Sequence, residues 1–282
     1  MNLIKKLSQG NYLIKIIYLN ILVFFIINII TVIWYLFGLD DSLDIQNTII
    51  HNLGASSSIN IFIKKPWTLI THMFIHFDIF HGFFNLCYLY FGGKIFIDYL
   101  SQKNLLYTYI MGGITGYVCY LISLNLFPVF DYMNDNIIVL GASASTLAIL
   151  IASATYVPNL SINIIWLNNI KLKYIAFILI IIDFLSIING NPGAHIAHIG
   201  GACYGYIYIC IKKKMGMEYL NNTITSLFDY SKSYKYKKEI DYEYNSLKNI
   251  EQKKIDKILD KISSSGYDSL SEDEKQKLFD QK

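Results

Sequence analysis

The sequence predicts an all-α, polytopic membrane protein, with a bundle of six transmembrane helices followed by a short cytoplasmic helical tail. The first observation is composition: of 282 residues, 54% are hydrophobic and only 16% are charged, whereas soluble domains carry about 25% charge. The second is a series of long apolar segments that ends near Lys212. The third is the charged, hydrophilic character of everything beyond that point.

Six apolar segments are long enough to cross a bilayer, which takes about 20 mostly apolar residues. They are residues 16–37, 79–100, 105–126, 137–157, 171–190 and 194–211. The first is too long for the core of a secretory signal and has no small-residue cleavage site, so we expect it to remain as an anchor. The chain then divides into a cytoplasmic N-terminus, a six-span domain, a linker and a cytoplasmic helical module, at residues 1–15, 16–212, 213–245 and 246–282.

The charges between these segments predict the orientation, because cytoplasmic loops carry an excess of Lys and Arg. Basic residues lie at the N-terminus, in two alternate loops and after the sixth span: Lys5, Lys6, Lys15, Lys103, Lys171, Lys173, Lys212, Lys213 and Lys214. The opposite loops contain acids: Asp40, Asp41, Asp44, Asp131 and Asp135, although Lys64 and Lys65 dilute the contrast. We therefore expect both termini in the cytoplasm, with spans two, four and six beginning at the outer surface.

This orientation brings polar residues of three spans to a similar depth. At about 1.5 Å per residue, Ser143 and Asn85 lie roughly 9 Å inside their spans, and His198 about 6–8 Å. His81 precedes Asn85 by one helical turn. Polar groups within a span usually face the bundle interior or a water-filled cavity, so these side chains are candidates for one site.

The residue types suit acyl transfer by serine, which needs a base for the hydroxyl proton and donors for the oxyanion. Ser143 can supply the nucleophile and His198 the general base. His81, Asn85 and the backbone N–H of Ser143 can supply the oxyanion hole. Small residues let helices pack closely at the site, and we assign this role to Gly141, Gly201 and Gly205.

Three motifs carry a resemblance to the rhomboid intramembrane serine proteases. The segment "GASA" around Ser143 is similar to the family's G-x-S motif in the fourth span. "HGFFN" is similar to its His-x-x-x-Asn, and "AHIGGACYG" to its Ala-His-x-x-Gly-x-x-x-Gly. "PWTLITHMFIHFDIFHGFFN" also resembles the family's first loop, and "YIMGGITGYVCYLI" its third span. The resemblance covers residues 16–212, with the motifs in the right order.

The resemblance implies a Ser143–His198 dyad without an acidic third member. It also implies an endopeptidase that cleaves transmembrane protein substrates near their outer ends through an acyl-enzyme. The expected location is the lipid bilayer of a bacterial inner or cell membrane. The protein is expected to need no cofactor and to bind no nucleic acid.

The same residues are open to other interpretations. Ser143 alone is compatible with helix packing, which is the expected role of Ser145. His195 is a rival base, and His72 and His76 are expected to be structural, with hydrogen bonds inside the first loop.

By their spacing, His195 and His198, or His72 and His76, could ligate zinc. Such a site is disfavoured because there is no H-E-x-x-H and nearby acids are few, so no metal is expected. The four cysteines give no disulfide framework. Asp183 in the fifth span is a functional candidate by its depth, but no partner can be named for it. At the level of function, the alternative is a catalytically inactive relative that binds membrane clients. A transporter ranks third, because its two halves should contain matching broken helices.

The tail contains an amphipathic pattern of Ile250, Ile255, Ile258, Leu259 and Ile262, which predicts a helix. "SSSG" should end it, and Ser271 with Glu274 predicts a capping box that opens a second short helix. This part resembles a small helical module that follows some bacterial rhomboid domains. A solvated helix pair is the simpler interpretation, and docking of a cytoplasmic partner is the alternative.

Overall fold

The computed structural model describes residues 11–38, 42–130, 137–164, 167–188, 191–215 and 256–279. The chain forms two compact units, Met1–Ile224 and Thr225–Lys282, and each is described by itself. Several sequence predictions fall outside the described residues: most of the cytoplasmic N-terminus, most of the linker, the start of the helical module, and the loop acids Asp40, Asp41, Asp131 and Asp135. The predicted domain boundaries stay predictions.

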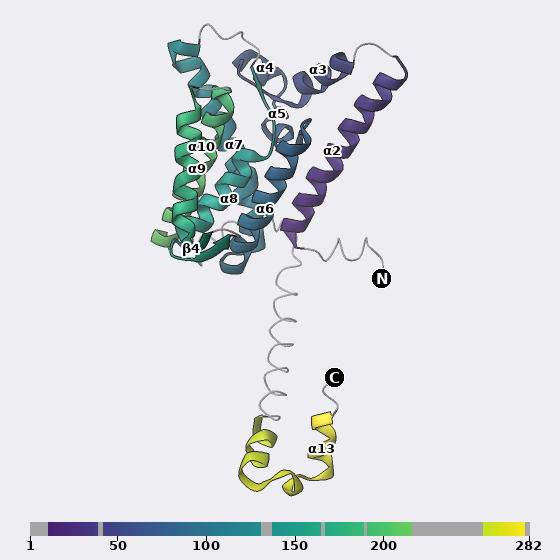
Figure 1. The fold of residues 1–282 in the computed structure, drawn as a ribbon, viewed down its shortest axis with the longest axis vertical. Helices are drawn as coiled ribbons and strands as arrows, with labels where there is room; N and C mark the ends of the chain where they lie inside the picture. Colours follow the sequence, from purple (N-terminus) through teal and green to yellow (C-terminus); the bar gives the residue numbers. More distant parts are fainter. Residues whose placement is uncertain are drawn as a thin grey trace. The chain divides into compact units, whose positions relative to one another are not determined.

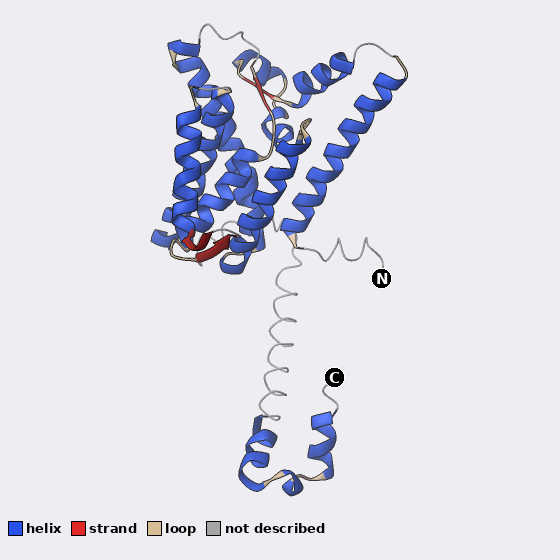
Figure 2. Cartoon of the chain, in the orientation of Figure 1, coloured by secondary structure: helices blue, strands red, loops and turns tan. Residues whose placement is uncertain are grey.

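The first unit is mostly helical, as the sequence predicts (Figures 1 and 2). Helices lie in all six predicted apolar segments: α2 (Tyr12–Leu36), α6 (Ile79–Tyr99), α7 (Gln102–Leu126), α8 (Ser143–Tyr156), α9 (Leu172–Ser186) and α10 (Pro192–Met215). Among the described residues, α2 and α7 are long and apolar enough to cross a membrane by length and composition alone. That all six helices cross a bilayer remains a prediction.

The fourth predicted span is not one continuous helix. Residues 137–142 precede α8 as non-helical chain, and strand β2 (Ile138–Val139) pairs antiparallel with β1 (Ala55–Ser56) in the first loop. Gly141 then has φ +112°, a conformation that glycine adopts far more readily than residues with a Cβ. Ser143 is therefore the first residue of its helix, rather than a residue about 9 Å inside it. With 14 residues, α8 is about 21 Å long, shorter than a hydrocarbon core of about 30 Å.

Three connecting segments carry structure that the sequence did not predict. The loop between α2 and α6 contains α3 (Ser42–Leu53), α4 (Ile59–Lys64), α5 (Thr68–Thr71) and the 3₁₀ turn η1 (His72–Phe74). A hairpin of β3 (Ser161–Ile164) and β4 (Leu167–Lys171) joins α8 to α9, and the turn η2 (Pro128–Phe130) follows α7. The all-α prediction is correct for the bundle but misses these two small sheets.

Side-chain caps explain where three long helices begin. Asn11, Asp78 and Ser101 are the N-cap residues of α2, α6 and α7, and each side-chain oxygen accepts a backbone N–H from the first turn. Such a cap satisfies one of the four N–H groups that a helix start leaves without an intrahelical acceptor.

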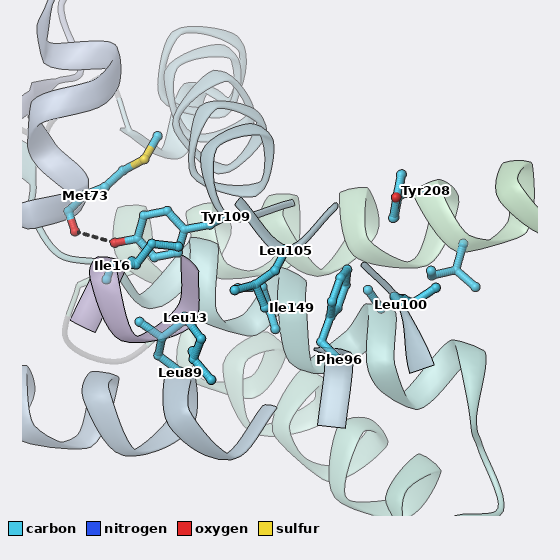
Figure 3. Close-up of a cluster of buried hydrophobic side chains, with 13 residues drawn as sticks. Leu13, Ile16, Met73, Leu89, Phe96, Leu100, Leu105, Tyr109, Ile149 and Tyr208 are labelled. Carbon is cyan, nitrogen blue, oxygen red and sulfur yellow. Dashed lines mark hydrogen bonds between the residues drawn. The ribbon is translucent and has the colours of Figure 1, made fainter. Parts of the chain in front are cut away.

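Helix α8 lies at the centre of the first unit, where it packs against α6, α7, α9 and α10. The largest hydrophobic cluster, drawn in Figure 3, joins α8 to α2, α6, α7 and α10. Within it the fully buried Tyr109 donates a hydrogen bond from its hydroxyl to the carbonyl oxygen of Met73 (3.3 Å), and it accepts one from Asn20 (3.2 Å). This polar link fastens α2 and the first loop to α7 inside an otherwise apolar core.

The outer faces of α2 and α9 are strongly apolar. On α2 the exposed large hydrophobic side chains include Leu22, Phe25, Ile29, Val32 and Tyr35; on α9 they include Tyr174, Phe177, Ile178, Ile182 and Phe184. Monomeric soluble proteins rarely expose contiguous apolar patches of this extent. These faces indicate a protein whose surroundings include lipid.

The second unit contains a helix at residues 256–265, the turn η3 (Tyr267–Ser269) and α13 (Glu272–Phe279). The predicted capping box is confirmed: the Glu274 carboxylate accepts from the Ser271 backbone N–H (2.8 Å), and the Ser271 hydroxyl accepts from the Glu274 N–H (3.3 Å). The break after the first helix falls at Gly266, with φ +79°. Among residues 256–279, which the structure describes, the buried apolar side chains are those of Ile258 and Leu270.

Candidate active site

Ser143 and His198 are in contact, although 55 residues separate them in the sequence. Ser143 Oγ lies 2.6 Å from His198 Nε2, a short hydrogen bond between the first residue of α8 and the first half of α10. The hydroxyl is the donor when Nε2 is unprotonated. This is the geometry a nucleophile and its general base need.

Two glycines of α10 allow this contact because they bring its backbone against that of α8. A Cβ on Gly201 would collide with the carbonyl oxygen of Ala144, and a Cβ on Gly205 with that of Ala148. Both glycines follow His198 on the same side of α10. The third predicted packing glycine, Gly141, precedes α8 and lies beside His81, whose Cε1 would be 2.9 Å from a Cβ there.

The expectation that no acid accompanies the dyad is wrong. Asp183, near the end of α9, accepts hydrogen bonds at Oδ1 from His198 Nδ1 and from His195 Nδ1, each at 2.8 Å. The Asp183 side chain is 14% exposed. Its predicted depth in the fifth span made Asp183 a candidate, but no partner could be named for it. The available signal was the short connection between α9 and α10, which brings the end of one helix beside the start of the next.

The same three residues, Asp183, His195 and His198, offer possible metal-ligating atoms that lie within 4.8 Å of one another. The sequence spacing allowed a metal-ligating pair at His195 and His198, but it did not bring Asp183 to that pair. Ligands of a tetrahedral zinc with Zn–N bonds of about 2.0 Å lie about 3.3 Å apart. The two 2.8 Å contacts are shorter than that and have the length of hydrogen bonds, so the trio is better described as a hydrogen-bonded group.

The oxyanion-hole candidates come from α6 and from α8 itself, and the side chains of His81 and Asn85 line the same pocket as Ser143. Because α8 begins at Ser143, the backbone N–H of this residue is one of those at a helix start that lack an intrahelical acceptor. Asn85 is buried, and its side chain lies 3.1 Å from His76 Nε2. The same Nε2 accepts the Ala142 N–H at 3.1 Å, so it is an acceptor. The Asn85 atom facing it is therefore the amide nitrogen, which has a second N–H to donate elsewhere.

The first loop supports the approach to Ser143 through its histidines. His72 accepts the Gly141 N–H at its carbonyl oxygen (2.8 Å), and its Nδ1 is 2.7 Å from the Thr68 carbonyl oxygen. His72 therefore bonds within the first loop, as expected. His76 interacts with the Phe74 backbone in that loop, and it also bonds to Ala142 and Asn85 outside the loop. Sequence reasoning missed this role, since nothing in the spacing links residue 76 to residue 142.

Burial keeps both loop histidines neutral at physiological pH. It lowers the pKa of His72 from its usual 6.5 to about 4, against a smaller opposing effect of the Thr68 carbonyl. It lowers the pKa of His76 to about 4 as well, with a further contribution from the nearby His81. A neutral His76 is required for the acceptor role at Nε2.

Ser143 and His198 line an open pocket of about 240 Å³ between α6, α8, α9 and α10. Its polar part is formed by His81, Asn85, Ser143, Thr146, Asp183 and His198. The remaining wall is apolar and comes from Phe84, Tyr88, Leu147, Leu150, Leu179 and Ile182. A mostly apolar pocket with a few convergent polar side chains is the usual character of a ligand-binding or active site.

The chain was compared with known proteins. The family model described as the rhomboid domain matches residues 64–214, which include every residue of the pocket. A second model, described as a family of unknown function, matches residues 238–280. The search of curated proteins gave no match.

Proposed function

Because the chain belongs to the rhomboid family, we propose that it is an intramembrane serine endopeptidase that cleaves membrane-spanning proteins near the outer side of the bilayer. The observation that carries this proposal is the 2.6 Å contact between Ser143 Oγ and His198 Nε2. Ser143 is the proposed nucleophile and His198 the proposed general base. No cofactor enters the reaction.

In the first half of the reaction, Ser143 Oγ forms a bond to the carbonyl carbon of the scissile peptide, and its proton moves to His198 Nε2. The carbonyl oxygen becomes an oxyanion, for which His81, Asn85 and the Ser143 N–H are the proposed donors. The C–N bond then breaks, and His198 gives its proton to the leaving amine.

In the second half, water attacks the acyl-enzyme and passes a proton to His198. The bond between the acyl carbon and Oγ breaks, and the proton returns to Ser143. The products are one new carboxyl end and one new amine end. Water reaches the acyl-enzyme through the same pocket, which is open.

The chain is proposed to be a multi-pass protein of the cell membrane, with both termini in the cytoplasm. The apolar faces of α2 and α9 support lipid contact. The proposed partners are the lipid bilayer and transmembrane protein substrates, with the C-terminal module as a docking site for a cytoplasmic partner.

The test is covalent labelling with a fluorophosphonate in detergent. The wild type should label, and Ser143→Ala and His198→Ala should lower labelling by at least about 10³-fold. Ser145→Ala is the matched control, because this buried hydroxyl on the same helix has no hydrogen-bond partner among the described residues; it should label like the wild type. Labelling that survives Ser143→Ala refutes the nucleophile. A folded wild type that never labels favours the alternative, an inactive client-binding relative.

A further inference from the structure

We infer that Asp183 is a positioning residue for His198, so that the site operates as a Ser–His–Asp arrangement rather than a dyad; this rests on the proposed function. The geometry is a continuous chain of hydrogen bonds from α9 through α10 to α8. Asp183 Oδ1 is 2.8 Å from His198 Nδ1, and His198 Nε2 is 2.6 Å from Ser143 Oγ.

The first consequence is the tautomer of His198. A carboxylate can only accept hydrogen bonds, so the proton of the neutral imidazole resides on Nδ1, facing Asp183. The lone pair is then on Nε2, facing the Ser143 hydroxyl, as a general base requires. With the opposite tautomer, Nε2 would carry a proton and could not take the one from Ser143.

The second consequence is electrostatic. When His198 takes the Ser143 proton it becomes a cation, and a carboxylate 2.8 Å away stabilises that cation in a partly water-excluded site. The side chains are only 14% exposed for Asp183 and 21% for His198. Asp183 itself remains unprotonated throughout, so no proton passes beyond His198.

His195 explains how Asp183 is held. Its Nδ1 donates to the same Oδ1 at 2.8 Å, from one helical turn before His198 on α10. An acid at the depth of a membrane helix is costly unless it has partners, and His195 supplies one that does not touch Ser143. We therefore assign His195 the role of holding Asp183 in place, and we expect its loss to affect the reaction less than the loss of Asp183.

The experiment uses the full-length protein in detergent and the fluorophosphonate reaction, in which Oγ displaces fluoride from phosphorus as its proton moves to His198. The maximal inactivation rate, kinact, and the half-saturating probe concentration, KI, are measured separately. Asp183→Asn should lower kinact by about 10²- to 10⁴-fold, because the imidazole loses its tautomer and its counter-charge. KI should stay within about threefold and the melting temperature within about 2 °C, because the side chains have nearly the same shape.

Three further variants sharpen the test. Asp183→Glu keeps the carboxylate and should recover part of kinact. His195→Ala should reduce kinact by less than about tenfold, since His198 keeps its own bond to Asp183. Asp98→Asn removes an exposed carboxylate near the end of α6 and should leave both constants unchanged.

The outcomes separate the inference from the proposed function. If wild type and Asp183→Asn label equally fast while Ser143→Ala does not label, Asp183 has no positioning role and the protease assignment stands. If Asp183→Asn lowers kinact and the melting temperature together and also changes KI, Asp183 acts in folding alone and the inference is overturned. A wild-type rate that is lost in EDTA and restored by Zn²⁺ identifies the trio as a metal site and also overturns it. If the folded wild type does not label, both proposals fail.

Discussion

The carbonyl oxygen of Ala144 occupies the place where a side chain on Gly201 would begin. This contact joins the residue directly after the proposed nucleophile to the helix that carries the proposed base. At this point α8 and α10 meet backbone to backbone, with no room for a side chain between them. Small changes at this contact should be transmitted directly to the distance between Ser143 and His198.

Gly201→Ala tests this relationship. The new Cβ must push α10 away from α8, and misplacement of reacting groups by about 1 Å can cost about 10²-fold in rate. We expect a fall of that size in fluorophosphonate labelling. Gly82→Ala is the control, because its Cβ would meet nothing closer than His76 Cβ at 3.5 Å. An undiminished rate in Gly201→Ala would show that the two helices can separate without affecting the site.

Gly205→Ala should have a different balance of effects. Its Cβ collides with the Ala148 carbonyl, one turn farther along α8 from Ser143. We expect a lower melting temperature, with less loss of labelling than in Gly201→Ala. The gain in helix propensity, about 1 kcal/mol for Gly to Ala, will not compensate for a backbone collision. Equal labelling losses in the two variants would contradict this order.

Asn85→Ala removes a proposed oxyanion donor. Loss of one such donor typically costs about 10²- to 10³-fold in kcat, and we expect a loss in that range for cleavage of a membrane-spanning substrate in proteoliposomes, with little change in KM. Asn159→Ala, at an exposed position before the hairpin, is the control. A change in KM alone would show that Asn85 contributes to substrate binding and not to stabilisation of the transition state.

His76→Phe should destabilise the approach to Ser143 while leaving its hydroxyl intact. The substitution removes the acceptor of the Ala142 N–H, and a buried donor without a partner costs about 1–3 kcal/mol. We expect a melting temperature several degrees lower and slower labelling. His51→Phe, which changes a solvent-exposed histidine in α3, should change neither. An unaltered melting temperature in His76→Phe would mean that the Ala142 N–H finds another acceptor.

The loop histidines also predict an acid limit to stability. His72 and His76 have folded-state pKa values of about 4, below the 6.5 expected when the chain is unfolded. Between these values the unfolded state binds more protons than the folded state, so stability decreases as pH falls from about 6.5 to about 4. Melting temperatures measured across this interval should fall, and the fall should be smaller in His72→Gln than in the wild type. An identical pH dependence in the two proteins would contradict the assignment.

A chain that ends at residue 224 should retain labelling. Every residue of the pocket lies in the first compact unit, and none comes from the second. We expect kinact within about twofold of the full-length protein, which is a change of less than 0.5 kcal/mol. Loss of labelling in a folded, truncated protein would show that the C-terminal module acts on the site.

The sequence predicted the meeting of Ser143 and His198 but only part of its setting. Apolar length and charge asymmetry predicted the helices, because burial in lipid demands them. The start of α8 at Ser143 depends on Gly141 and on strand pairing with Ala55, which is a tertiary contact across more than 80 residues. Asp183 was noticed for its depth, but its partner depends on how α9 and α10 turn about their axes. No local sequence pattern predicts the rotation of these two helices about their axes.

The strand and turn before Ser143 leave backbone amides that no helix satisfies, and the first loop supplies their acceptors at His72 and His76. Non-helical chain is tolerated at membrane depth only where protein or water shields it from hydrocarbon. The non-helical chain before Ser143 needs polar contacts from the first loop. The depth at which the Ser143 hydroxyl can lie therefore depends on how far this loop extends into the bundle. If the proposed protease function holds, the length of the first loop limits the depth at which a peptide bond can be cleaved.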